Sequence, residues 1–94
     1  MMQPHEKTKL EVLRCMEHPL DLKLLRGTIP WSLAGTSGDR RRANLERRDT
    51  LVRRIGEAIG ERYSVQLEPV DPRTGRIGLV FHSRANDARI EWRW

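Results

Sequence analysis

Arginine is the residue type through which this sequence could do chemistry, and arginines are concentrated between residues 40 and 54. They are Arg40, Arg41, Arg42, Arg47, Arg48, Arg53 and Arg54. Only Glu46 and Asp49 oppose them, so this stretch carries the +5 that is also the net charge of the whole chain. Guanidinium groups form paired hydrogen bonds with phosphate and carboxylate oxygens. The cluster therefore predicts a binding site for a polyanion, either nucleic acid (DNA or RNA) or an acidic protein surface.

A second interpretation of the same cluster is an ordinary solvated surface. The pairs Arg42–Glu46 and Arg53–Glu57 have the i,i+4 spacing of helical salt bridges. Against this, three adjacent arginines stand where a helix is expected to begin, and the helix macrodipole disfavours cations there. A sequence that accepts such a local conflict is more often using the charge for binding. We favour the binding interpretation and keep the other open.

Two further groups are candidate contact residues. Arg73 and Arg76 flank the tip of an expected turn, DPRTGR, and could add to the basic site. Trp92 and Trp94 lie in an alternating C-terminal segment, and tryptophan is enriched at protein interfaces. The alternatives are a turn with solvated charges, and two indoles that complete the core of a protein with only 5% aromatic residues.

Residues typical of catalysis are dispersed. His5, His18 and His82 are far apart in the sequence, and Cys15 with His18 makes only half of a zinc site. No glycine-rich stretch has the spacing of a phosphate-binding loop. We therefore expect no enzymatic activity, no cofactor and no metal.

The element that must present the arginines is a long helix over about residues 39–62. It contains no proline, and its apolar residues recur every three or four positions. These residues are Leu45, Val52, Ile55 and Ile59. Ser37 or Asp39 is the expected N-cap. Arg41 and Arg48 fall on the apolar side, where an unpaired guanidinium is costly to bury, so the first two turns are expected to project beyond the core.

The residues before this helix predict further helical structure. Residues 4–17 have apolar residues at helical spacing, and the residue before Pro19 should end that helix. Residues 20–25 fit either a strand or a helix; we favour a short helix opened by Pro19 and stopped by Gly27. Residues 28–37 are expected to be a linker, with Trp31 and Leu33 packed against the core.

After residue 62 the period of the apolar residues changes to two, which indicates strands. Alternating segments at 63–68, 77–81 and 88–94 are separated by expected turns at 71–75 and 83–87. The inward residues should be Val65, Leu67, Ile77, Leu79 and Ile90. The predicted fold is α+β: N-terminal helices packed on a C-terminal three-stranded antiparallel sheet, in a single small basic domain of residues 1–94.

Composition limits the setting. A chain of 94 residues with 37% hydrophobic residues has a thin core, so its C-terminal strand could pair with a second copy in a homodimer. A single cysteine indicates a reducing compartment. No apolar run approaches the roughly 20 residues that span a bilayer, and no signal peptide is evident, so we expect a cytoplasmic protein without membrane contact.

The function predicted from these observations is a small, non-enzymatic nucleic-acid-binding or regulatory module whose arginine-rich helix contacts phosphates. The alternative is an interaction or inhibitor module, of mobile-element or phage type, that docks on an acidic protein through its arginines and C-terminal tryptophans.

Overall fold

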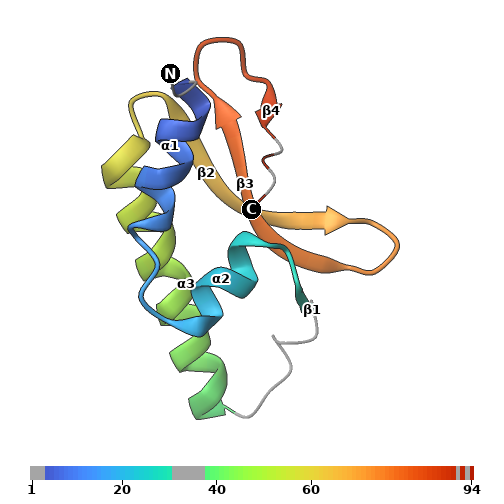
Figure 1. Cartoon of the computed structure of the whole chain (residues 1–94). Helices are drawn as coiled ribbons and strands as arrows, with labels where there is room; N and C mark the ends of the chain where they lie inside the picture. Colours follow the sequence, from blue (N-terminus) through green and yellow to red (C-terminus); the bar gives the residue numbers. More distant parts are fainter. Residues whose placement is uncertain (1–3, 31–37, 91, 93) are drawn as a thin grey trace.

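A computed structural model describes residues 4–30, 38–90, 92 and 94, and it has an α+β fold (Figure 1). The helices are α1 (Pro4–Leu13), α2 (Pro19–Leu25) and α3 (Gly38–Ile59). The strands are β1 (Ile29–Pro30), β2 (Tyr63–Asp71), β3 (Arg76–Ser83) and β4 (Arg89–Ile90). The predicted order, helices followed by an antiparallel sheet, is confirmed, and the long helix lies within about two or three residues of its predicted bounds.

The first helix ends earlier than predicted, at Leu13 rather than residue 17. The amides of Cys15 and Met16 donate to carbonyls three residues back, at 3.0 and 3.1 Å, which tightens the last turn. His18 then begins a new helix, because its Nδ1 accepts the N–H of Leu20 at 3.0 Å. The sequence predicted only that His18 ends the first helix; in the structure α1 ends at Leu13 and His18 is the N-cap of α2.

Residues 20–25 form the helix that we favoured. Helix α2 ends in a Schellman motif, with the N–H of Thr28 on the carbonyl of Lys23 and that of Gly27 on Leu24. Gly27 has φ +65°, the left-handed conformation that glycine adopts without strain. The prediction that Gly27 stops this helix is confirmed.

The sheet is built around β3. Strand β2 pairs with one edge of β3, from Tyr63 opposite Ser83 to Asp71 opposite Arg76. The other edge pairs with β1 at one end and with β4 at the other. Strand β1 corrects the prediction of a linker from residue 28, since Ile29 and Pro30 pair with β3; Trp31, Leu33 and Ser37 lie outside the described residues.

The third predicted strand, residues 88–94, is represented by the two residues of β4; of the rest of its C-terminal part, only residues 92 and 94 are described. Figure 1 shows the β2–β3 hairpin changing direction about halfway, so that its tip points away from α1 and α3. In this hairpin Gly78 of β3 is opposite Glu68 of β2.

The core lies between α3, α1 and the inner face of β3. Its buried residues include Val12, Leu24, Leu51, Ile55, Ile59, Ile77, Leu79 and Phe81. Val65, Leu67 and Ile90 are partly buried against it, as predicted. One prediction is wrong: Leu45 is 42% exposed, whereas Leu51 is fully buried in its place.

Within the described residues, no helix combines the length and apolar character needed to cross a bilayer.

Candidate nucleic-acid interface

The Arg47 side chain forms an ion pair with another residue of the same chain, Asp21. Its Nε donates to Oδ1 of Asp21 at 2.9 Å and its Nη2 donates to Oδ2, which makes a two-bond ion pair between α3 and α2. The Asp21 side chain is fully buried and also accepts the N–H groups of Glu17 and His18, at 3.0 and 3.1 Å. Burial opposes ionisation of Asp21, but these hydrogen bonds outweigh it and lower the pKa of the carboxyl.

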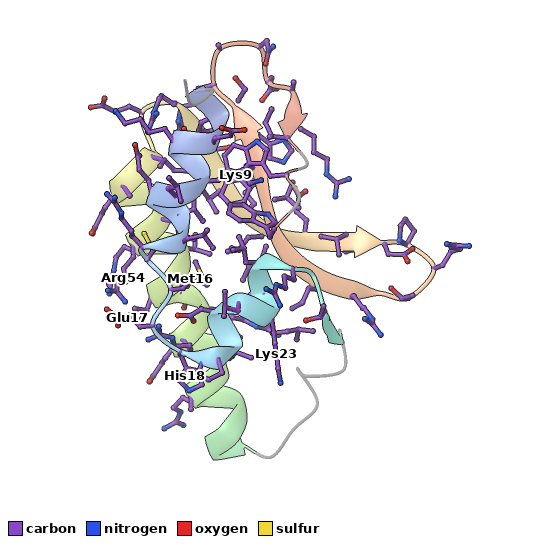
Figure 2. All side chains as sticks on the ribbon, viewed as in Figure 1. Lys9, Met16, Glu17, His18, Lys23 and Arg54 are labelled. Carbon is purple, nitrogen blue, oxygen red and sulfur yellow. The ribbon has the colours of Figure 1, made fainter. Side chains whose placement is uncertain are left out.

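Arg54 forms a similar ion pair about two turns further along α3. Its Nη2 donates to Oε1 of Glu17, in the turn that joins α1 to α2 (Figure 2). This hydrogen bond lowers the pKa of Glu17 and raises that of Arg54. Arg47 and Arg54 were predicted to contact a polyanion; the structure gives each of them an internal carboxylate partner.

Arg48 lies on the apolar side of α3, as its spacing predicted. Two of its nitrogens, Nε and Nη2, are inaccessible to solvent and have no hydrogen-bond partner among the described residues. Loss of hydration lowers the pKa of this guanidinium. Arg48 is therefore poorly placed to reach an external anion.

Arg42 and Arg53 are the exposed arginines of α3 whose side chains are described. Neither forms an ion pair within the described part of the chain, so the i,i+4 bridges Arg42–Glu46 and Arg53–Glu57 are not made. Arg40 and Arg41 belong to the same first turns of α3 as Arg42, but their side chains lie outside the described set.

The beginning of α3 extends past α2 and the sheet. Figure 1 shows the first turns of this helix continuing beyond α2, with the helices of the core only alongside its later turns. The exposure of Leu45 agrees with this placement. The predicted projection of the first turns is confirmed; of their arginines, Arg42 is the one whose side chain is described, and it is exposed.

The hairpin arginines form a separate group. The side chain of Arg73 is 93% exposed and its Nε is 3.9 Å from Oδ1 of Asp71; Arg76 is also exposed. The hairpin tip and the start of α3 lie at distant points of the molecule in Figure 1. The structure therefore does not bring Arg73 and Arg76 into one cluster with the arginines of α3.

The C-terminal tryptophans contact other aromatic side chains of the same chain. The Trp92 ring stacks on Phe81 with centroids 4.8 Å apart and meets Tyr63 edge-on at 5.4 Å. Trp94 meets Trp92 at 5.5 Å, and Nζ of Lys9 lies 5.5 Å from the centroid of the Trp94 ring. Both indoles remain half-buried. These contacts agree with the alternative in which the indoles complete the core.

Sequence reasoning missed two residues that organise this region. Asp21 holds both a helix start and Arg47, and its position three residues after His18 is the spacing of a capping box. Arg62 joins the end of α3 to α1, because it donates to Oγ1 of Thr8 at 3.1 Å and to Oε2 of Glu11 at 2.7 Å. No spacing rule could have identified Arg62, since its partners lie about fifty residues away.

Cys15 is a packing residue in this arrangement. It is half-buried, its Sγ lies 3.4 Å from the Glu11 carbonyl oxygen, and burial raises the pKa of its thiol despite the opposing charge of Arg54. Among the described residues, no three His, Cys, Asp or Glu side chains are grouped in a way that could hold a metal ion.

In comparisons with known proteins, no protein-family model, no curated protein and no solved structure matches this chain.

Proposed function

We propose that this protein binds nucleic acid through the projecting first turns of α3. The observation that carries the proposal is the placement of these turns: they extend beyond the packed helices and sheet, and Arg42 is exposed there with no ion pair to a described residue (Figure 1). Arg40 and Arg41 belong to the same turns.

The chemistry of this end suits phosphate. The unsatisfied N–H groups and the macrodipole make a helix N-terminus positive, and the arginines add full charges to it. The same arrangement opposes folding, because cations at a helix N-terminus are unfavourable. Polyanion binding explains why the sequence keeps three arginines where they weaken the helix.

The alternative, docking on an acidic protein, has less support. It relied partly on Trp92 and Trp94 as interface residues, and their contacts with Phe81, Tyr63 and each other account for them within the fold. Arginines bind both phosphates and carboxylates, so an experiment is needed to distinguish a nucleic-acid partner from an acidic protein.

The test compares two double variants that remove equal charge. Arg41→Gln with Arg42→Gln alters the projecting turns, and Lys7→Gln with Arg14→Gln removes two exposed cations, in α1 and directly after it, without described ion pairs. Binding to duplex and single-stranded DNA is measured against salt concentration. The first variant should weaken both and lower the duplex salt slope by about two, since each lost phosphate contact lowers it by about 0.9.

The first variant should stay folded, because removing cations from a helix N-terminus should slightly stabilise the helix. If the two variants weaken DNA binding equally, the arginines at the start of α3 are an ordinary solvated surface and not a specific contact site. Absence of nucleic-acid binding by the wild type would overturn the proposal and leave the acidic-protein alternative, in which the same substitutions slow association with a protein partner.

A further inference from the structure

A groove of about 250 Å³ lies between the C-terminal end of α2, β3 and β4. Buried Leu25 and Phe81 are among its lining residues, together with the half-buried Trp92 and Trp94. The groove is remote from the first turns of α3, which project past the opposite end of α2 (Figure 1). It is therefore a separate site.

The charged side chains described in this groove are arginines. Arg26 and Arg89 line it, both are exposed, and neither forms an ion pair with any described residue. No aspartate or glutamate is among its described lining residues. Two unpaired guanidinium groups beside an apolar, aromatic surface fit a ligand that combines a planar ring with negative charge.

The volume of the groove limits the size of the ligand that it could hold. Pockets for drug-sized ligands occupy about 300–1,000 Å³, so 250 Å³ suits a single ring system rather than a complete cofactor. Trp92 stacks on Phe81, with an interplanar angle of 28°, which fixes the orientation of the indole and covers one of its two faces. Fixed aromatic rings next to arginines are the usual platform for unpaired nucleobases.

A peptide strand fits this place less well. Among the described residues, the outer edge of β3 pairs with β1 at Arg76 and Ile77 and with β4 at Phe81 and His82, which leaves the short interval 78–80 between these two strands. At Gly78 the backbone of α2 closes this short interval: an added Cβ would lie 2.7 Å from the Gly27 Cα. Strand addition needs a longer open edge.

We propose that the groove receives one unpaired nucleobase of a single-stranded nucleic acid, with Arg26 and Arg89 contacting its phosphates. This inference rests on the proposed nucleic-acid binding, but it assigns strand selectivity to residues outside α3. The start of α3 would then hold any nucleic-acid backbone, and the groove would add affinity only for a strand whose bases are free to leave the stack.

The experiment titrates the whole chain with a short oligothymidylate, a duplex of equal phosphate number and a polyglutamate peptide. The groove variant is Arg26→Gln with Arg89→Gln, and the charge-matched control is again Lys7→Gln with Arg14→Gln. All four residues are exposed, so each variant should keep the wild-type melting temperature. The groove variant should bind oligothymidylate about tenfold more weakly than the control does and bind the duplex equally well.

Equal loss for both DNA probes, or a loss no larger than that of the control, would overturn the inference. Groove-dependent binding of polyglutamate without oligothymidylate binding would overturn it in favour of an acidic peptide. If the wild type binds DNA and only the α3 variant weakens it, the groove proposal fails and the α3 proposal stands. If only the groove variant weakens DNA binding, the α3 proposal fails and the groove proposal stands.

Discussion

At the scale of single residues, the arginines of α3 divide by what surrounds each guanidinium. Arg47 meets a buried carboxylate and Arg42 meets solvent, while Arg48 has two nitrogens that meet neither solvent nor a described acceptor. Burying guanidinium N–H groups without an acceptor is unfavourable, whereas the aliphatic stem packs favourably. Among the described residues of α3, Arg48 is thus the one whose charged group is buried without a hydrogen-bond partner.

Replacing this guanidinium with an apolar side chain should remove the conflict. Arg48→Met keeps the stem and should leave stability unchanged or raise it by up to about 1–3 kcal/mol, as measured by urea unfolding. Arg42→Met, at an exposed position of the same helix, is the control and should change stability by no more than about 0.5 kcal/mol. A clear loss of stability in Arg48→Met would mean that, in the protein in solution, a hydrogen-bond acceptor does pair with this guanidinium.

At the scale of elements, the contact between α2 and β3 depends on two glycines. An added Cβ at Gly78 would lie 2.7 Å from the Gly27 Cα and 2.9 Å from the Leu24 carbonyl oxygen, which are backbone atoms that cannot turn away. At Gly27 an added Cβ would lie 2.5 Å from Cγ2 of Val70, and φ is +65°. The end of α2 can therefore approach the sheet this closely only where both residues lack a side chain.

The Gly78→Ala variant should separate α2 from the sheet and destabilise the fold by about 1–3 kcal/mol. Gly56→Ala, inside α3 with no atom within 4 Å of the added Cβ, should instead stabilise it by about 0.5–1 kcal/mol through helix propensity. Thermal unfolding of the two variants measures both effects. A stable Gly78→Ala protein would show that this contact is looser than the structure indicates.

At the scale of the whole molecule, ion pairs between distant segments hold the helices together. Asp21–Arg47 joins α2 to α3, Glu17–Arg54 joins the preceding turn to α3, and Arg62 ties the end of α3 to α1. The first of these pairs is buried on the carboxylate side. Breaking a buried pair by removing one charge costs about 3–5 kcal/mol, more than any exposed pair contributes.

The Asp21–Arg47 pair should make the whole fold sensitive to acid. Because folding lowers the pKa of Asp21, its contribution is complete above the unfolded pKa, near 3.9, and is lost as pH falls through the lower folded value. The free energy of unfolding, measured by urea titration from neutral pH to about pH 2, should fall in that window. In Asp21→Asn, the amide can still accept the N–H groups of Glu17 and His18, but the ion pair is gone.

We expect the variant to lose about 3–5 kcal/mol at neutral pH and to show a shallower acid dependence than the wild type. Glu46→Gln, at an exposed carboxylate without a described ion pair, is the control and should follow the wild-type curve. Parallel pH profiles for the wild type and Asp21→Asn would contradict the role assigned to this pair.

Local patterns in the sequence determined most of the elements. The change of apolar period near residue 62 placed the boundary between helix and sheet, and Pro19 with Gly27 bounded α2. These features depend on backbone sterics and on side chains a few residues apart, which the sequence displays directly. The projecting, basic start of α3 was predictable for the same reason.

Only the tertiary structure decided which side chains are buried and which arginines are free. Leu45 and Leu51 both lie near the apolar side of α3, but the core is alongside the later turns, so Leu51 is buried and Leu45 is not. Arg47 and Arg53 look alike in sequence, yet Arg47 meets Asp21, 26 residues away, and Arg53 stays in solvent. Such pairings depend on how α2 crosses α3, and no local periodicity contains that information.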